Sequence, residues 1–449
     1  MRLAIIGAGW AGMAAAVQGT LAGHHVSVFE ASHSLGGRAR SLDGQRADAT
    51  PVTLDNGQHI LIGAYSESLR LLQLVGVDLP SALLRQTLTL RFPDGKGLQF
   101  PNWPAPLDAL AGLLVARGWS LTDKWLALLE MTRWQRQGFT CHESLSVAQL
   151  CQRLSPRVQT ELIEPLCLSA LNRPPDQASA SVFLRVLRDA VRGPSGSSHL
   201  LLPRVSLSEL FPAPARRWLD ARGCAIELGS RVHKLSLSGS QWQVQERAFD
   251  RVILATPARD AVKIVSLSTP NFPATRARSS EAWLSLCNDL QFDAIATVYA
   301  WASNATLTHP MLALRSGTHG SAAGPAQFVF DRGQLGGPAG LLAFVVSAST
   351  LERKTLQTQV LEQARQQLGL ELQVVQTIVE KRATFACSPA LRRPGASVCD
   401  GLLACGDYVA GPYPATLEGA VRSATAAVAA LSAHDQGETV ACSDAIARE

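Results

Sequence analysis

Residues 1–40 read MRLAIIGAGWAGMAAAVQGTLAGHHVSVFEASHSLGGRAR, and this stretch decides the fold. The short apolar run at residues 3–6 predicts a buried parallel strand, and residues 26–29 predict a second one. Between them, residues 13–21 predict a helix. A strand, a helix and a strand in so short a span are typical of a βαβ unit, so we expect the chain to open with a parallel sheet.

Three glycines stand between the first strand and the helix in G-x-G-x-x-G spacing. Gly7 allows a tight turn, Gly9 lets a pyrophosphate approach the backbone, and Gly12 lets the helix pack closely on the strand. The N–H groups that begin the helix favour phosphate oxygens. Glu30 ends the second strand, where a carboxylate can bind a ribose hydroxyl. Together these residues predict a dinucleotide site.

The next motif indicates which dinucleotide binds. Glu30 and Ala31 are followed by Gly36, Gly37 and Arg38. This order resembles the extended motif of the flavin amine oxidase and carotenoid desaturase superfamily, where the Gly-Gly-Arg turn lies over the FAD pyrophosphate. The resemblance implies FAD and an α/β architecture: a Rossmann-like FAD/NAD(P)-binding fold with an inserted mixed α+β substrate domain.

Two further stretches resemble a narrower family. The run DNGQHILIGAYSESLRLL at residues 55–72 and the run ELIEPLCLSALNRPP at residues 161–175 are similar to the squalene-associated flavoproteins, the hydroxysqualene dehydroxylases. The resemblance implies an FAD-dependent oxidoreductase that removes the allylic hydroxyl of hydroxysqualene, giving squalene for hopanoid-type triterpenes. A hydrophobic polyprenoid substrate and a reductant of unidentified nature follow from that activity.

The end of the chain carries a matching motif. The apolar run at residues 402–405 predicts a strand that ends at Gly406 and Asp407, where doubly wound sheets bind ligands. A helix is expected from Thr416, with its N-terminus toward the flavin. The resemblance also implies that Val232 binds the adenine end through its backbone. The residues predicted to bind the cofactor are Gly7, Gly9, Trp10, Ala11, Gly12, Glu30, Ala31, Gly37, Arg38, Gln58, His59, Val232, Gly406, Asp407, Leu417 and Ala420.

Two side chains are candidates for the proton donor that loss of a hydroxyl requires. His59 comes first, because the resemblance brings residues 55–59 beneath the isoalloxazine; the alternative is a polar turn with Gly57 at positive φ. Glu164 is the second candidate. The alternative for this residue is a position on the surface of a helix, without a role in catalysis. Pro165 is expected to break the helix over residues 161–175.

A tryptophan-rich segment allows two interpretations. Residues 104–134 predict a helical, apolar region that contains or adjoins Trp103, Trp119, Trp125 and Trp134. It forms either the core of the substrate domain or a surface that contacts a membrane or opens a lipid tunnel. Loss of Trp119 and Trp125 together is expected to weaken membrane binding under the second interpretation.

Composition restricts the class of protein. The chain has 449 residues, which favours two domains, and its net charge of +5 is modest, without the basic run that nucleic-acid binding would need. Nine cysteines without a C-x-x-C pair or a cluster at metal spacing indicate a reduced, cytoplasmic protein with no metal site. With no apolar run long enough to span a bilayer, any membrane contact is expected to be peripheral, at the cytoplasmic face.

The predicted parts alternate along the chain. The FAD-binding domain is expected at residues 1–80, 200–265 and 381–433, the substrate domain at residues 81–199 and 266–380, and a mobile tail at residues 434–449. A helix is also expected over residues 207–222. Two rival functions stay open: a carotenoid-type desaturase, and a non-catalytic flavoprotein partner of a prenyl synthase. The chain has four tyrosines in all, and Tyr413 is the one candidate for a position beside the flavin. Amine oxidation is therefore disfavoured, because amine oxidases need an aromatic cage there.

Overall fold

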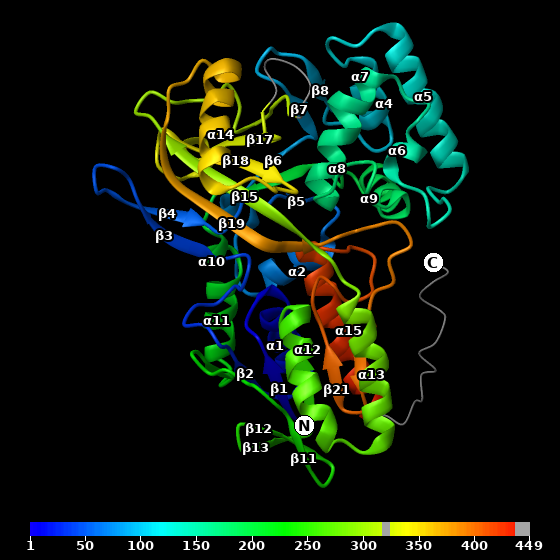
Figure 1. Ribbon diagram of the computed structural model, residues 1–449, viewed down its shortest axis with the longest axis vertical. Coiled ribbons are helices and arrows are strands. Elements are labelled where there is room, and N and C mark those ends of the chain that lie inside the picture. Colours follow the sequence, from blue (N-terminus) through cyan, green and yellow to red (C-terminus); the bar gives the residue numbers. More distant parts are fainter. Residues whose placement is uncertain (317–323, 436–449) are drawn as a thin grey trace.

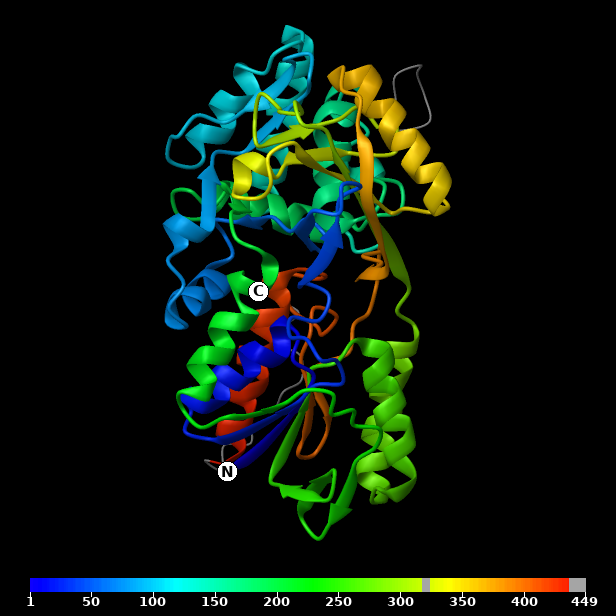
Figure 2. The same cartoon turned by 90° about the vertical axis from the view of Figure 1, so that its left-hand side faces the viewer.

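The computed structural model describes residues 1–316 and 324–435. Of the predicted mobile tail, residues 436–449 lie outside the described part. The molecule is elongated, with a parallel sheet toward one end and an antiparallel sheet toward the other (Figure 1, Figure 2).

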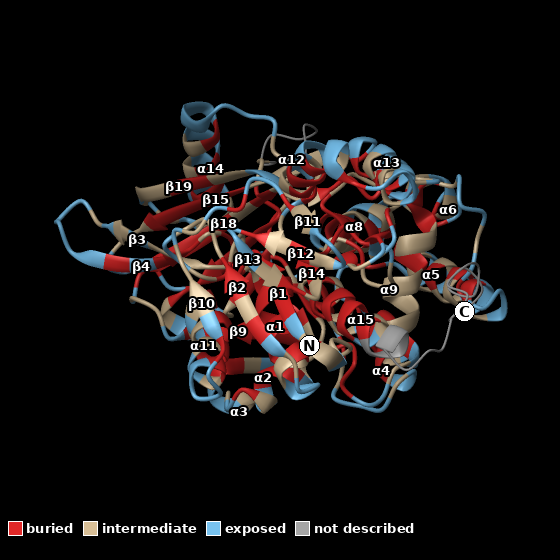
Figure 3. Ribbon diagram, turned by 90° about the horizontal axis from the view of Figure 1, so that it is seen from below, coloured by how far each residue is buried: buried red, intermediate tan, exposed pale blue. Residues whose placement is uncertain are grey.

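The first sheet has six strands, and five of them are parallel. Its order is β10 (Ala225–Glu227), β2 (His25–Phe29), β1 (Arg2–Ile6), β14 (Arg251–Leu254), β21 (Leu402–Ala404) and β20 (Ser397–Cys399), with β20 antiparallel to β21. The inner strands are buried almost throughout, as expected when helices cover both faces (Figure 3). The predicted strands at residues 3–6 and 26–29 are confirmed.

Helices cover both faces of this sheet (Figure 2). On one face lie α1 (Trp10–Leu21), α11 (Pro212–Asp220) and α15 (Leu417–Asp435); on the other lie α12 (Ala258–Ser268) and α13 (Ala274–Asn288). The first helix begins at Trp10 rather than at residue 13, because the turn that precedes it is completed by Gly9.

The second sheet has five antiparallel strands, and α14 (Arg353–Leu368) packs on it. Its order is β16 (Met311–Ala313), β17 (Phe328–Asp331), β18 (Leu341–Ser347), β15 (Phe292–Trp301) and β19 (Gln373–Phe385). Sequence analysis missed β19, whose polar residues and irregular register give no clean two-residue alternation.

The remaining strands are short, and the remaining helices range from a single turn to the sixteen residues of α5. The strands are β3 (Ser41–Gln45), β4 (Pro51–Asp55), β5 (Leu61–Ile62), β6 (Leu83–Gln86), β7 (Thr89–Arg91), β8 (Gly97–Gln99), β9 (Leu200–Pro203), β11 (Ser236–Ser238), β12 (Gln241–Val244) and β13 (Arg247–Phe249). The helices are α2 (Ser66–Leu74), α3 (Leu79–Ala82), α4 (Leu107–Leu114), α5 (Leu121–Arg136), α6 (Val147–Leu150), α7 (Pro156–Val158), α8 (Glu164–Leu171), α9 (Ala180–Arg192) and α10 (Leu207–Leu210).

The predicted break at Pro165 is wrong. Helical backbone continues from α7 into α8 through a π-helical turn, Gln159–Ile163, and Pro165 occupies the first turn of α8. A wide turn tolerates the missing N–H of a proline, because the regular hydrogen-bond ladder is already interrupted there. The helix ends at Asn172, whose φ of 53° is left-handed, and so it does not reach residue 175, where the predicted helix ended.

Two other predicted helices each divide in two. The region over residues 104–134 forms α4 and α5, separated by a loop whose Ser120 caps α5 through the backbone N–H of Asp123. The helix over residues 207–222 forms α10 and α11, which are separated by Phe211 in a non-helical conformation.

The predicted domain ranges stay a prediction. The boundary between residues 265 and 266 falls inside α12, and α13 packs on β20 of the parallel sheet. We therefore propose that the cofactor-binding part continues to Asn288, the last residue of α13.

Candidate functional site

A cavity of about 1070 Å³ opens at the carboxyl ends of the parallel strands. Gly7 follows β1, Glu30 follows β2, Thr256 follows β14, and Asp407 follows β21; all four line this cavity. The chain order of the strands reverses between β1 and β14, which is the position where open α/β sheets bind ligands.

The three motif glycines have different structural roles. A Cβ on Gly12 would lie 1.8 Å from the carbonyl oxygen of Gly7, so this glycine permits helix α1 to pack on the turn. Gly7 has a φ of +105° and lies against Ala255, which directly follows β14. A Cβ on Gly7 would lie 2.8 Å from the carbonyl oxygen of Ala255. Gly9 is different, because a Cβ there would meet nothing closer than 3.9 Å. Gly9 therefore exposes backbone to the cavity.

The N-terminus of α1 is suited to an anion. Gly9 is its N-cap, no side chain caps it, and its first turn has no acidic residue. Trp10 and Ala11 of this turn line the cavity. Uncapped N–H groups at a helix start attract phosphate oxygens.

Glu30 is held firmly at the cavity wall. One oxygen of its carboxylate accepts a hydrogen bond from the backbone N–H of Ala8 at 2.6 Å, and the other accepts one from Ser32 at 2.8 Å. These bonds fix the carboxylate at the end of β2, where a ribose hydroxyl would lie in the predicted complex.

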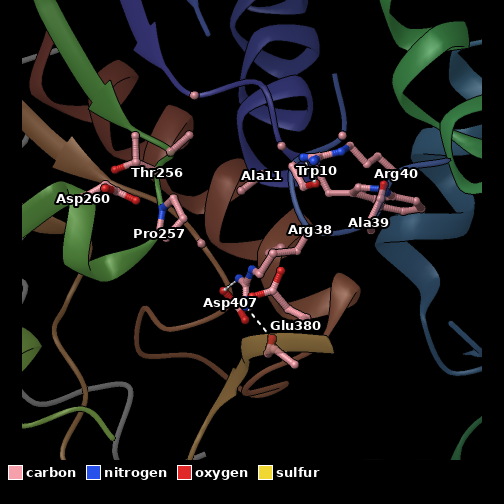
Figure 4. Close-up of a pocket in the computed structure, with 18 of the residues that line it drawn as sticks. Trp10, Ala11, Arg38, Ala39, Arg40, Thr256, Pro257, Asp260, Glu380 and Asp407 are labelled. Carbon is pink, nitrogen blue, oxygen red and sulfur yellow. Dashed lines mark hydrogen bonds and ion pairs between the residues drawn. The ribbon is translucent and has the colours of Figure 1, made fainter. Parts of the chain in front are cut away.

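Arg38 crosses the cavity to Asp407 (Figure 4). Its Nη2 lies 2.5 Å from Asp407 Oδ1, and its Nη1 donates to the carbonyl of Ala383 at 2.6 Å. Residues from the first forty and the last fifty of the chain are thus brought into one ion pair, beside the N-terminus of α1. A fixed guanidinium here would add positive charge for a pyrophosphate.

Sequence analysis missed a polar network under the cavity. Tyr299 Oη donates to the carbonyl of Asp55 at 2.9 Å and accepts from Gln58 Nε2 at 3.0 Å, while Arg332 Nη1 donates to Gln58 Oε1 at 3.2 Å. Arg332 Nη2 also lies 3.8 Å from Asp55 Oδ2. Tyr299 lies on β15 and Arg332 directly follows β17, so this network joins the second sheet to the end of β4 and to the loop that carries Gln58.

This network should stabilise the fold. Replacing Tyr299 with Phe leaves the N–H of Asp55 and the amide of Gln58 without their shared oxygen, so we expect unfolding free energy to fall by about 1–3 kcal/mol. Tyr408→Phe is the matched control: Tyr408 is equally buried, but within the described chain its hydroxyl has no hydrogen-bond partner. Urea unfolding of both variants measures the difference, and equal stabilities would contradict this role for the network.

His59 lies at the cavity, and its Nδ1 is 3.3 Å from the carbonyl oxygen of Gly57. Burial lowers the pKa of the imidazole, and the positive charge of Arg38 lowers it further. Without a bound anion the ring is therefore neutral near pH 7. Gly57 does not adopt the positive φ of the alternative interpretation.

Glu164 is not brought to the cavity. It stands at the start of α8, whereas Ser169 and Ala170, further along the same helix, line the wall. Burial raises the pKa of the Glu164 carboxyl. Its side chain is not part of the cavity wall in which the flavin is predicted to lie.

Every residue predicted to bind the cofactor lines this cavity except Gly12, which packs beneath it. Their roles in binding stay a prediction. Thr256 supplies a test of fit, because its buried Oγ1 lies in the wall and lacks a hydrogen-bond partner among the described residues. Such a group indicates that a ligand completes the site. The glycine cradle and the uncapped helix suit a phosphate-bearing cofactor.

Other kinds of site find no support in the described residues. Across residues 1–316 and 324–435, no group of histidine, cysteine and acidic side chains is placed to hold a metal ion. Over the same residues, no helix combines the length and apolar character needed to cross a bilayer.

The fold and this cavity define a flavin-dependent oxidoreductase, and comparison with known proteins agrees. The sequence profile of the flavin containing amine oxidoreductases matches residues 10–432. The chain belongs to the flavin containing amine oxidoreductase family. An oxidoreductase from Methanosarcina mazei, 17% identical, has the same fold, with a TM-score of 0.68 over 95% of this chain and 99% of that one.

Curated relatives lie within this family. A hydroxysqualene dehydroxylase from Sinorhizobium fredii is 27% identical over 93% of this chain and 95% of its own length. Another from Zymomonas mobilis is 25% identical over 95% of this chain and 98% of its own. A 15-cis-phytoene desaturase from Synechococcus elongatus is 24% identical over 53% of this chain and 51% of its own.

Proposed function

We propose that this protein is an FAD-dependent hydroxysqualene dehydroxylase. The observation that carries the proposal is the extent of the similarity to enzymes of that name, 93% or more of this chain, which includes both the cofactor-binding part and the second sheet. Similarity to the phytoene desaturase stops at about half of the chain, so desaturation is the second candidate.

The proposed reaction replaces the allylic hydroxyl of hydroxysqualene with hydrogen. Hydroxide leaves poorly, so a proton must reach the oxygen as the C–O bond breaks, and water departs from an allylic cation. Reduced FAD, when bound, supplies the hydride that forms the new C–H bond. The product is squalene, a precursor of hopanoid-type triterpenes, and a reductant of unidentified nature restores the reduced flavin.

The chain's own residues have three tasks in this proposal. Gly9 and the start of α1 hold the pyrophosphate with Arg38, and Glu30 holds the ribose. His59 holds or transfers a proton at the cavity wall, next to Gln58, which accepts a hydrogen bond from Arg332. Because hydroxysqualene is an apolar lipid, we place the enzyme at the cytoplasmic face of a membrane, in peripheral contact with it.

We expect heat-released cofactor to be FAD by chromatography, and Glu30→Ala to weaken FAD binding by about 1.5–3 kcal/mol, through loss of a charge-assisted hydrogen bond. Glu227 ends the neighbouring strand β10 and does not line the cavity, so Glu227→Ala is the control and should bind FAD normally. Titration of both apoproteins measures the affinities.

Glu30 also bonds to two backbone N–H groups, so the stability of the apoprotein must be measured as well. Lower stability with unchanged FAD affinity would leave Glu30 a structural residue only. Any cofactor other than FAD would contradict the assignment.

Anaerobic turnover tests the activity. Chemically reduced protein should oxidise its flavin when hydroxysqualene is added, with squalene formed in equal amount. Conjugated, coloured polyenes from an oxidised enzyme would instead indicate a desaturase. Flavin that stays reduced with every substrate would favour the non-catalytic partner of a prenyl synthase.

A further inference from the structure

Large apolar side chains are concentrated on one part of the surface. Among the described residues, eleven large apolar side chains are exposed, and eight of these lie between residues 103 and 129. The core of this patch, the α4–α5 face, consists of Leu107, Leu110 and Leu114 on α4 and Leu121, Trp125 and Leu129 on α5. A cluster of this kind is unusual on a protein that acts alone in water.

The exposed side chains follow the helix period. On α5, at about 100° per residue, Leu121, Trp125 and Leu129 lie within about 80° of one another. Leu121 is 85% exposed and Trp125 is 63% exposed. Leu107, Leu110 and Leu114 repeat the pattern on α4, which packs against α5 at the end of the molecule away from the parallel sheet (Figure 1, Figure 2).

The basic and acidic side chains of α5 lie on different sides of the helix. Lys124 and Arg133 lie on either side of the apolar stripe of α5, and Arg136 continues the stripe toward the C-terminus. The acidic residues lie on the opposite side: Asp123 caps the helix through Ser120, and the buried Glu130 pairs with Arg133 at 3.3 Å. Basic side chains that flank an apolar stripe match an anionic lipid surface.

Trp119 does not belong to this face, contrary to the prediction that paired it with Trp125. Its side chain is 6% exposed, and its Nε1 donates to Glu161 Oε2 at 2.9 Å. Trp134 is buried as well. These two tryptophans thus belong to the core, as the first interpretation of the segment predicts, whereas Trp125 lies on the surface. Membrane contact of the segment stays a prediction.

We propose that the α4–α5 face docks on a membrane that contains anionic phospholipid. Leucine and tryptophan side chains enter the interfacial layer, while Lys124 and Arg136 contact lipid phosphates. The inference deepens the proposed function, because a polyprenoid substrate resides in lipid, but the docking surface itself is argued from exposure and charge.

Flotation of the FAD-loaded protein with vesicles tests the proposal. We expect binding to vesicles of phosphatidylcholine with phosphatidylglycerol, and weaker binding to phosphatidylcholine alone. Leu121→Ser with Trp125→Ser should lower the partition coefficient at least about tenfold. Lys124→Gln and Arg136→Gln should each lower it about fivefold, on anionic vesicles only.

Leu21→Ser with Leu351→Ser is the matched control, because these leucines are exposed outside the α4–α5 face, and it should float as the unaltered protein does. Equal flotation of the Leu121/Trp125 variant and the control would overturn the proposal. So would a dimer in sedimentation that this variant converts to a monomer, since a second copy would then cover the face.

Flotation does not depend on turnover, so it separates this proposal from the proposed function. The Leu121/Trp125 variant should convert hydroxysqualene presented in detergent micelles at the normal rate. Normal flotation without any turnover would count against the dehydroxylase and leave the docking surface in place.

Discussion

Replacing Gly12 with Ala should prevent stable folding. The new Cβ would lie 1.8 Å from the carbonyl oxygen of Gly7, and that oxygen belongs to a turn whose own φ of +105° leaves little freedom to move. Helix α1 would have to separate from β1, with loss of packing in a fully buried part of the core. We expect a loss of at least about 4 kcal/mol, measured by thermal unfolding of the apoprotein or as failure to accumulate.

Gly9→Ala is the matched comparison, and it should behave in the opposite way. Its φ of −71° suits alanine, and its Cβ would approach nothing nearer than Gly37 Cα at 3.9 Å. The apoprotein should therefore keep its stability within about 1 kcal/mol. The methyl group would occupy the space of the pyrophosphate, so FAD affinity should fall at least about tenfold.

These two variants separate a glycine needed for folding from a glycine needed for binding. If Gly9→Ala bound FAD as tightly as the unaltered protein, the phosphate would lie elsewhere in the cavity. If Gly12→Ala folded normally, the contact between α1 and the Gly7 turn would be looser than the structure has it.

Local patterns account for what the sequence predicted well. The strands at residues 3–6 and 26–29 are short apolar runs beside glycines, and both the turn and the strand type follow from neighbours in the chain. The motif at Gly406 and Asp407 is of the same kind. Its ion pair with Arg38 joins positions more than 360 residues apart, and only the resemblance indicated that the two motifs meet.

Long-range contacts account for what was missed. Nothing near Arg332 or Tyr299 in the sequence marks them, because their partners Gln58 and Asp55 lie more than 240 residues away. Trp119 and Trp125 show the same limit. The sequence predicted a helical, apolar region around both tryptophans but gave no sign that Trp125 faces outward, whereas the bond to Glu161 holds Trp119 inside.

The protonation of His59 determines whether this side chain can donate the proton. Burial and Arg38 lower the pKa of His59 below its ordinary value of about 6.5, so the folded protein binds this proton less readily than the unfolded chain. Stability from this site is thus lost as pH falls through about 6.5. His59→Gln, which cannot be charged, should lose less stability between pH 7 and pH 5.

His59→Ala should slow dehydroxylation by about 10²–10⁴-fold while FAD stays bound, because a general acid contributes a factor of this size. If His59 is the acid, the imidazolium is the active form, so kcat should fall as pH rises through the pKa that His59 has in the FAD-loaded enzyme, and this fall forms one limb of the pH profile. His59→Gln keeps a donor for the Gly57 carbonyl but supplies no proton, so it should be as slow as His59→Ala and lack the limb.

A structural histidine gives another result: His59→Gln would restore turnover, or His59→Ala would lose FAD together with activity. Near-normal turnover in a folded, FAD-loaded His59→Ala protein would exclude His59, and Glu164, outside the cavity wall, could act only if substrate binding moved α8 toward the flavin.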